Sequence, residues 1–315
     1  MTEEAIGRAR AGDTRALARL VSLAENGSPE LRPVMKALAP LTGKARVIGL
    51  TGAPGVGKST VTAALVSAYR ERDLRVGVLA VDPTSPFSGG ALLGDRVRMQ
   101  DHATDPGVFI RSMASRGHLG GLSAATPQAL RVLDAAGFGV VLVETVGVGQ
   151  AEVEIASLAD TTLVLAAPGM GDAIQAAKAG ILEIGDIFVV NKRDHPGAQE
   201  TVRDLRTMIA MARRGEQDWK PPIVTTVATA GDGIADLTAA IDAHWSWLDS
   251  SGERVRRRRA RAREEVAAIA VAALRQRMGG LPGDSRLDSL AARVAAGELD
   301  PYSAADELVA AASVG

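Results

Sequence analysis

The chain has no cysteine, few aromatic residues and no long hydrophobic run, and each absence excludes a class of protein. Without cysteine, neither a disulfide framework nor a thiolate metal site can form. The four histidines are scattered, which argues against a histidine-rich zinc or nickel carrier. The longest apolar stretch, 266–274, is far too short to span a bilayer, and the N-terminus lacks the basic and apolar segments of a signal peptide. We therefore expect a cytoplasmic protein that does not act at a membrane.

An excess of charge of one sign is also missing, since 36 Lys and Arg residues balance 37 Asp and Glu residues. This balance gives no reason to expect a nucleic acid or an anionic membrane as partner. Positive charge is concentrated in one segment, 254–263, where seven of ten residues are arginine. They would fall on every side of a long predicted helix that reaches about Met278, and no aromatic residue accompanies them. We interpret this segment as a solvated helix or a dimer arm.

Short apolar runs recur along the chain, separated mostly by helical stretches, and 46% of the 315 residues are hydrophobic. The runs lie at 46–50, 75–81, 139–143, 161–166, 186–190 and 223–228. Because they show no polar alternation, they predict strands buried on both faces. The expected fold is α/β, with a doubly wound, mostly parallel sheet in residues 45–249, an N-terminal helical segment in 1–44 and a C-terminal helical extension in 250–315. We expect the apolar stripe of the extension to pack against a partner subunit; its residues are Leu287, Leu290, Val294 and Leu299.

The first apolar run is followed directly by G-A-P-G-V-G-K-S, which is the pattern of a phosphate-binding loop. The glycines let backbone N–H groups turn towards phosphate oxygens, Lys58 adds a positive charge, and the Ser59 hydroxyl is placed to bind Mg²⁺. A glycine turn that merely starts a helix is the alternative. The predicted phosphate-binding residues are Gly52, Ala53, Pro54, Gly55, Val56, Gly57, Lys58, Ser59 and Thr60.

Acidic residues follow two later runs, at the sheet edge where ligands of such folds bind. Asp82 and Asp95 belong to a predicted switch loop and would hold Mg²⁺ through water or orient the attacking water, although Asp82 also fits a turn cap before proline. Glu144 would lie beside Mg²⁺, with the Gly147 N–H meeting the γ-phosphate. Gln150 either orients the water or is simply solvated. The candidate catalytic residues are thus Lys58, Asp82, Asp95, Glu144 and Gln150, and the candidate metal ligands are Ser59, Asp82, Asp95 and Glu144.

The segment Asn191-Lys192-Arg193-Asp194, again directly after an apolar run, indicates guanine as the base. Asp194 can accept hydrogen bonds from the N1–H and the exocyclic amine of guanine, whereas adenine lacks this pair of donors. A site of this kind rejects the wrong base by roughly 10⁴-fold. Lys192 would lie along the base plane, and Asn191 would tie this loop to the phosphate loop. The Ala228 N–H could close over the guanine.

These motifs together resemble the MeaB/ArgK family of P-loop GTPases of the SIMIBI class. The matching segments are G-A-P-G-V-G-K-S-T, V-D-P-T-S, G-G-A-L-L-G-D-R-V-R-M, R-G-H-L-G-G-L-S, E-T-V-G-V-G-Q-A-E and N-K-R-D. The resemblance implies a Mg²⁺-dependent GTPase, GTP to GDP and phosphate, that is the chaperone of an adenosylcobalamin-dependent acyl-CoA mutase, methylmalonyl-CoA mutase or a close relative. GTP binding and hydrolysis would be coupled to loading and protection of the mutase cofactor. It also implies a homodimer held by the C-terminal extension, with adenosyltransferase as a second partner and the cobalamin bound by the mutase.

Two segments depart from the pattern of that family. In 171–180 the family usually has a lysine where this chain has Ala179, and Arg111 to Gly117 replaces R-P-S-P-S-S-G near the expected switch region. Arg116 there would contact phosphate or partner, or be solvated. Three other functions remain open: an ATP-dependent kinase linked to amino-acid transport, a metal-insertion GTPase, and a nucleotide-gated binding module that does not hydrolyse appreciably without its partner.

Overall fold

The computed structural model describes residues 2–82, 102, 104–114, 125–145, 151–169, 183–211, 215, 218–277 and 285–313. Contacts between residues divide the chain into two units, 1–255 and 256–315. No helix within the described ranges combines the length and apolar character needed to cross a membrane.

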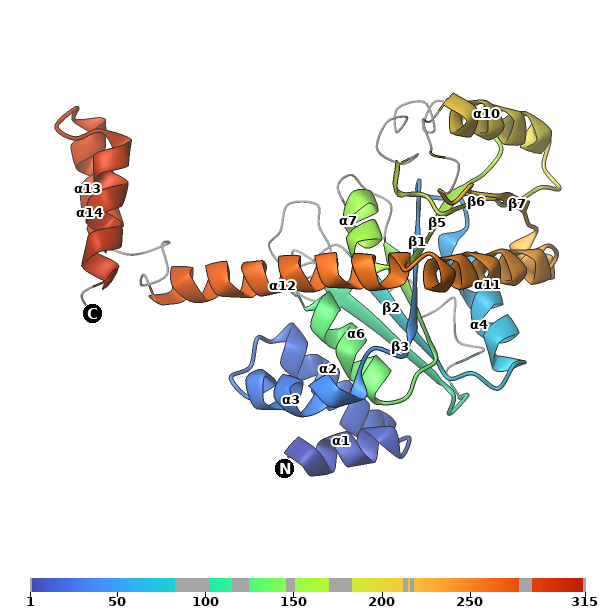
Figure 1. The fold of residues 1–315 in the computed structure, drawn as a ribbon, viewed down its shortest axis with the longest axis horizontal. Coiled ribbons are helices and arrows are strands. Elements are labelled where there is room, and N and C mark those ends of the chain that lie inside the picture. Colours follow the sequence, from blue (N-terminus) through green and yellow to red (C-terminus); the bar gives the residue numbers. More distant parts are fainter. Residues whose placement is uncertain are drawn as a thin grey trace. The chain divides into compact units, whose positions relative to one another are not determined.

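The first unit is built on one seven-stranded sheet in which every strand pair is parallel (Figure 1). The strands are β1 (Arg46–Gly52), β2 (Val76–Asp82), β3 (Val108–Ala114), β4 (Val140–Thr145), β5 (Thr161–Ala166), β6 (Ile187–Val190) and β7 (Ile223–Thr225). Their spatial order is β3-β2-β4-β1-β5-β6-β7. The chain leaves β1 towards β2 on one side and later returns to β5 on the other. The carboxyl end of β1 is therefore the switch point at which such sheets bind ligands, and the predicted doubly wound fold is confirmed.

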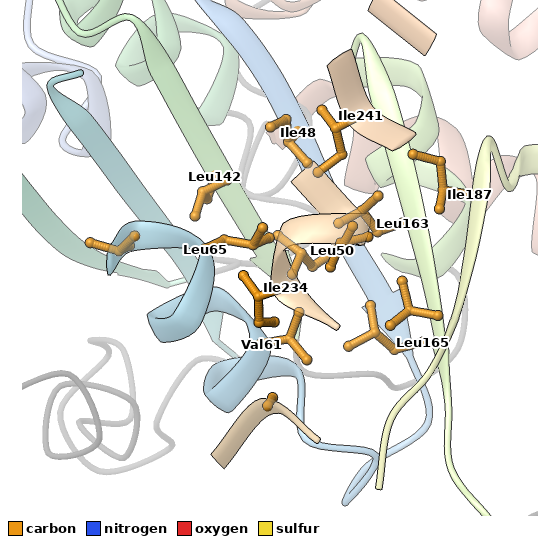
Figure 2. Packing of buried hydrophobic residues seen from close by; sticks show 14 of the residues in the cluster. Ile48, Leu50, Val61, Leu65, Leu142, Leu163, Leu165, Ile187, Ile234 and Ile241 are labelled. Atoms are coloured by element: carbon orange, nitrogen blue, oxygen red, sulfur yellow. The ribbon is translucent and has the colours of Figure 1, made fainter. Parts of the chain in front are cut away.

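Helices cover both faces of the sheet. They are α1 (Thr2–Arg10), α2 (Thr14–Glu25), α3 (Leu31–Leu38), α4 (Lys58–Arg70), α6 (Thr126–Ala135), α7 (Ala151–Leu158), α10 (Ala198–Met211) and α11 (Ile234–Ser250), with short 3₁₀ turns η1 (Ala39–Leu41) and η3 (Ala228–Ala230). On one face, α4 and α11 pack on the central strands through a buried aliphatic cluster that includes Leu50, Leu65 and Ile241 (Figure 2). On the other face, α1, α2, α3 and α6 share a core with β2, β3 and β4. The N-terminal helices thus belong to the same hydrophobic core as the sheet.

Strand β3 was not predicted from the sequence. Its apolar run is only three residues long, and the polar Arg111 and Ser112 follow, so it lacks the continuous apolar character of the other strands. Among the described strands it lies at the edge of the sheet and pairs with β2 alone. Arg111 forms an ion pair with Glu25 of α2 and donates to Ser22 Oγ at 3.0 Å. It therefore fastens the N-terminal helices to the sheet edge.

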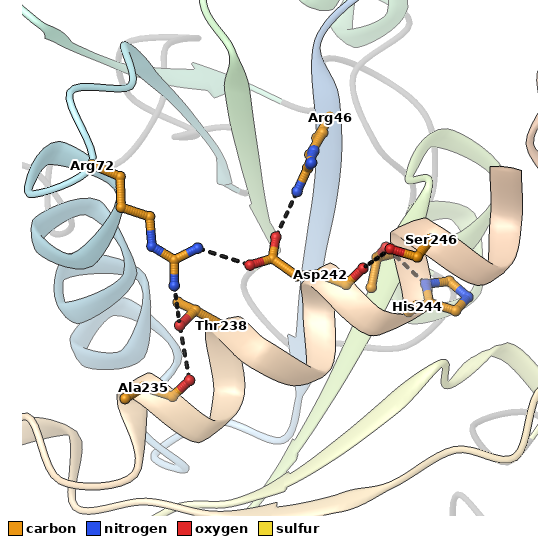
Figure 3. A network of polar contacts seen from close by, with 8 residues as sticks. Arg46, Arg72, Ala235, Thr238, Asp242, His244 and Ser246 are labelled. Carbon is orange, nitrogen blue, oxygen red and sulfur yellow. Dashed lines mark hydrogen bonds and ion pairs between the residues drawn. The ribbon is translucent and has the colours of Figure 1, made fainter.

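A polar network fixes α11 against β1 and the end of α4 (Figure 3). The Asp242 carboxylate accepts from Arg46 of β1 at 2.6 Å and from Arg72, just after α4, at 2.8 Å. Arg72 also donates to the Thr238 hydroxyl at 2.7 Å. Because α4 begins in the phosphate loop, this network joins the helix that carries the loop to α11 at its far end.

Farther along α11, His244 is fully buried at the amino-terminal edge of the sheet. Its Nδ1 lies 2.8 Å from Thr161 Oγ1, and its Nε2 lies 3.3 Å from Asp186 Oδ1. The ring is stacked on Trp247, with the ring of Trp219 also close by. Since Thr161 begins β5 and Asp186 immediately precedes β6, this histidine holds α11 to two neighbouring strands.

The second unit contains most of the long helix α12 (Glu253–Arg277), which confirms the helix predicted there, together with α13 (Ser285–Ala295) and α14 (Pro301–Ser313). Here one expectation was wrong. The apolar stripe Leu287, Leu290, Val294 and Leu299 packs against Ala304 and Leu308 of α14 in the same chain. Ala304 and Leu308 are four residues apart, so α14 presents a matching apolar face. The stripe therefore closes a helical hairpin.

Candidate nucleotide site

The phosphate loop leaves β1 at the switch point and enters α4 through left-handed glycines. Gly55 and Gly57 have φ values of 81° and 94°, a region that side chains other than glycine adopt with strain. Lys58 is buried, and its ammonium group donates to the carbonyl oxygens of Gly52 and Ala53 at 2.8 and 3.1 Å. A positive charge is thus held at the centre of the loop, beside the N-terminus of α4, where an anion is favoured. The remaining loop residues differ in exposure: Pro54 is exposed, Val56 is buried and Thr60 is half-buried.

A carboxylate from β4 reaches the start of α4. Glu144 is 4% exposed, and its Oε1 accepts from Ser59 Oγ at 2.7 Å. Its Oε2 lies 3.2 Å from Thr62 Oγ1. The structure therefore brings together two of the predicted metal ligands, Ser59 and Glu144. Hydroxyl and carboxylate oxygens are the hard donors that Mg²⁺ prefers, so the residues present fit this ion.

The other predicted ligands and catalytic residues are less fully described. Asp82 is the last residue of β2, in register with Ala114, so its backbone lies at the carboxyl edge of the sheet. Asp95, Gly147 and Gln150 lie outside the described residues, as do Arg116 and the segment 171–180 with Ala179.

Asn191 links three parts of the site, as the sequence predicted in part. Its side-chain amide donates to the Val56 carbonyl of the phosphate loop at 2.9 Å. Its Oδ1 accepts from Thr226 Oγ1 and from the Ala228 N–H, both at 3.1 Å. The base contact predicted for the Ala228 N–H is not supported by this geometry, because that N–H donates to Asn191. The segment after β7 orients the asparagine.

The rest of the predicted base loop is held from both sides. Lys192 has a left-handed φ of 57°, and its ammonium group donates to the Gly55 carbonyl at 2.9 Å. The Arg193 N–H donates to the Thr226 carbonyl at 3.0 Å, and its guanidinium forms an ion pair with Asp232. Asp194 is exposed at the tip of this loop. A strained turn with this many supports presents the Asp194 carboxylate from a fixed backbone.

Sequence reasoning missed three residues that shape the site: Thr62, Thr226 and Asp232. Thr62 follows Ser59 at helical spacing i to i+3, which is a usable signal once α4 is predicted. Thr226 contacts Asn191, and Asp232 contacts Arg193, from a segment more than thirty residues later in the chain. No local pattern marks such contacts.

A parallel sheet with a G-x-x-x-x-G-K-S loop at its switch point defines a P-loop nucleotide-binding protein. The comparison with known families narrows this class. The family model described as Methylmalonyl Co-A mutase-associated GTPase MeaB matches residues 17–281. The chain belongs to this family.

Individual relatives support the assignment to this family. A protein of Pyrococcus abyssi that carries a GTPase name is 47% identical over 311 residues, covering 98% of this chain and 96% of the relative. The mouse protein named Methylmalonic aciduria type A homolog, mitochondrial, is 35% identical over 214 residues, covering 67% of this chain and 52% of the relative. A crystal structure described as LAO/AO transport system kinase matches with a TM-score of 0.72 and 26% identity, covering 98% of this chain and 96% of that one. The chain is a GTPase that binds guanine nucleotide and hydrolyses GTP to GDP and phosphate.

Proposed function

We propose that this GTPase is the nucleotide-dependent chaperone of an adenosylcobalamin-dependent acyl-CoA mutase, methylmalonyl-CoA mutase or a close relative. It would couple GTP binding and hydrolysis to loading and protection of the mutase cofactor. The name of the family and the name of the mouse relative support this proposal. The observation that carries the nucleotide-binding part of the proposal is the connection of the phosphate loop to the base loop through Asn191 at the switch point, beside the buried Ser59–Glu144 pair.

In this proposal the phosphates are bound by the loop backbone and by Lys58. The proposed set is Gly52, Ala53, Pro54, Gly55, Val56, Gly57, Lys58, Ser59 and Thr60. Ser59 and Glu144 hold Mg²⁺, with Asp82 and Asp95 as further ligands. The bound ion would neutralise charge that develops on the phosphates during hydrolysis. Lys58 stabilises the same charge from the loop, because its ammonium group is held in a buried position where a charge interacts strongly.

The base is recognised by Asp194, which accepts from the N1–H and the amine of guanine. Lys192 and Arg193 keep the backbone of that loop in place through the Gly55 carbonyl and Asp232. Rejection of adenine follows, because adenine would leave the carboxylate without its paired donors.

Partner contacts are assigned to the loops that follow β2 and β4. The first, from Asp82 to Asp95, and the second, from Glu144 to Gln150, would report the bound nucleotide to the mutase. Gly147 would sense the γ-phosphate, and Gln150 would orient the attacking water. Residues 250–315 would form the arm of a homodimer, and adenosyltransferase would be a second partner. Exposed apolar side chains on α12, including Val266, Ile269 and Leu274, support a role for this helix in association.

The test is GTP hydrolysis by the purified protein, alone and with each candidate acyl-CoA mutase, with ATP as the competing substrate. Asp194→Asn is the diagnostic variant, and Asp204→Asn, an exposed carboxylate on α10, controls for loss of one negative charge. We expect one mutase to accelerate GTP turnover. Asp194→Asn should lower kcat/KM for GTP about 10- to 100-fold, the worth of one charge-assisted hydrogen bond, while Asp204→Asn should not.

Two results would contradict the proposal in different ways. Equal use of ATP and GTP, unchanged by Asp194→Asn, would refute the base assignment and favour a kinase, the activity for which the related crystal structure is named. GTP-selective turnover that no mutase alters, with no complex formed, would leave the GTPase and remove the chaperone role.

A further inference from the structure

A second hydroxyl on α4 contacts the buried carboxylate of Glu144. Thr62 lies nearly one helical turn after Ser59 and is fully buried. Its Oγ1 is 3.2 Å from Glu144 Oε2, whereas Ser59 Oγ donates to Oε1 at 2.7 Å. One face of α4 therefore contacts both oxygens of the same carboxylate, one with each hydroxyl.

We infer that Thr62 is a positioning residue that holds Glu144 in the orientation needed at the Mg²⁺ site. This inference rests on the proposed nucleotide site. A glutamate side chain at a strand end has three rotatable bonds, so contacts to both of its oxygens restrict its orientation more than a contact to one of them. Thr62 is β-branched and buried, and in a helix its χ1 is restricted to two main rotamers. It can therefore fix the plane of the carboxylate at little further cost in entropy.

Because Ser59 and Thr62 contact different oxygens of Glu144, the two contacts have different consequences for Mg²⁺ binding. The Ser59 hydroxyl is itself a proposed ligand, so its hydrogen bond to Glu144 competes with ligation. The Thr62 contact involves the other oxygen, and Thr62 is not part of the phosphate-loop pattern. Thr62 can therefore hold the Glu144 carboxylate whether the Ser59 hydroxyl donates to Glu144 or binds Mg²⁺.

A purely structural role for Thr62 is the competing explanation. Its Oγ1 also lies 3.0 Å from the Lys58 carbonyl, the bond to the preceding turn that threonine often makes in helices. The one hydroxyl hydrogen is then shared between a carbonyl and a carboxylate, and hydrogen bonds to charged acceptors are the stronger kind. Thr201 of α10 offers a matched comparison. It is also buried and donates to the carbonyl four residues earlier, that of Gly197, at 3.2 Å.

The experiment compares Thr62→Val, which keeps the shape and removes the hydroxyl, with Thr62→Ser, which restores the hydroxyl, and with Thr201→Val. Fluorescent GDP is titrated in the full-length protein at a series of Mg²⁺ concentrations and in excess EDTA. Thermal unfolding of each variant shows that it is folded, and kcat and KM for GTP are measured separately. Thr62→Ala carries the same prediction if the valine variant does not fold.

We expect Thr62→Val to raise the Mg²⁺ concentration for half-maximal GDP binding on the order of tenfold, the worth of one hydrogen bond to a charged group. Affinity for GDP in EDTA should change less than about twofold, since Thr62 contacts the Lys58 carbonyl and not the ammonium group of Lys58 that would bind phosphate. Thr62→Ser should restore most of the Mg²⁺ response, and kcat should fall more than KM rises. Thr201→Val should resemble the unmodified protein in every binding measurement.

The outcomes separate the two proposals. If the unmodified protein binds GDP equally with and without Mg²⁺, the Mg²⁺ site proposed at Ser59 and Glu144 is wrong and the role of Thr62 is lost with it. If the unmodified protein responds to Mg²⁺ and Thr62→Val responds identically, only the positioning role is refuted. An equal loss of GDP affinity with Mg²⁺ and in EDTA also refutes it, because that pattern is the effect of a merely structural residue.

Discussion

Substitution of Gly57 by alanine should break the Asn191 link between the phosphate loop and the base loop, whereas the same substitution at Gly55 should not. Both glycines have positive φ values, 94° and 81°, so both alanines suffer backbone strain. A Cβ at Gly57 would lie 2.4 Å from Asn191 Nδ2, the group that donates to the Val56 carbonyl. A Cβ at Gly55 would meet nothing within 4 Å. The pair therefore separates strain from steric displacement.

The expected magnitudes follow from these contacts. A left-handed alanine costs about 1–2 kcal/mol at either position. At Gly57 the asparagine must also move, and Asn191 is 3% exposed, so a buried hydrogen bond is lost or weakened at a further cost of about 1–3 kcal/mol. Gly57→Ala should thus destabilise the protein by about 2–5 kcal/mol in all, and Gly55→Ala by only about 1–2 kcal/mol.

The assay is urea unfolding of the nucleotide-free protein, followed by far-UV circular dichroism, for both alanine variants and for each combined with Asn191→Ala. With Asn191 shortened, the clash at Gly57 is relieved, so the two effects at that pair should be less than additive, by at least about 0.5 kcal/mol. Gly55→Ala and Asn191→Ala should add. Equal unfolding midpoints for Gly55→Ala and Gly57→Ala would refute the reasoning, as would strict additivity of Gly57→Ala with Asn191→Ala.

Three further predictions concern other parts of the first unit. His244→Ala removes the hydrogen bond with Thr161 and the contact with Asp186 and leaves a cavity, and should lower the free energy of unfolding by about 2–5 kcal/mol in the same urea assay. Hydrogen bonds from Arg70 and from a backbone N–H lower the pKa of Asp105. The ionised Asp105 carboxylate therefore stabilises the fold above its unfolded pKa of about 3.9, and this stabilisation is lost as the pH falls through the lower folded pKa. The free energy of unfolding of Asp105→Asn should accordingly converge with that of the unmodified protein in acid. Asp232→Ala should weaken fluorescent GDP binding about twofold to fivefold by releasing Arg193, and the charge-swapped double variant should recover part of the loss; unchanged binding would show that this exposed pair does not support the base loop.

The sheet could be predicted from the sequence wherever burial on both faces forces a continuous apolar run. β1, β4, β5 and β6 are of this kind, and β4 and β5 are buried along their whole length. β3 could not be predicted in this way, because it is the outermost of the described strands on its side and polar side chains follow its short apolar run. Arg111 is acceptable there only because Glu25, 86 residues earlier, supplies the opposite charge. Local patterns cannot report an ion pair made by a distant helix.

The residues of the candidate site likewise fall into those that local sequence patterns predict and those that they do not. The residues at strand ends and in the phosphate loop, such as Glu144, Lys58 and Ser59, are marked by motifs, because phosphate and metal chemistry demands particular side chains at particular spacings. Thr62 and Thr226 support those residues from the side, and many side chains of similar shape could occupy their places in a helix or a loop. Likewise, the sequence shows that Leu290 belongs to an apolar stripe but not which surface covers it. The residues that bind phosphate and metal could be predicted, whereas the residues that pack beside them are determined by tertiary packing.

Asn191 shows how such support makes one site from two loops. Its amide nitrogen faces a carbonyl, that of Val56, and its oxygen faces two donors, the Thr226 hydroxyl and the Ala228 N–H. Exchanging the nitrogen and oxygen would place like groups against one another at the Val56 carbonyl and at the Ala228 N–H, whereas the Thr226 hydroxyl can either donate or accept, so the two backbone contacts fix the orientation of the amide. An aspartate could satisfy the two donors but would set a charged oxygen against the Val56 carbonyl in a buried position. The loop that selects the base is thereby held to the loop that binds the phosphates through a neutral group with both a donor and an acceptor, and movement of either loop must break hydrogen bonds to the other.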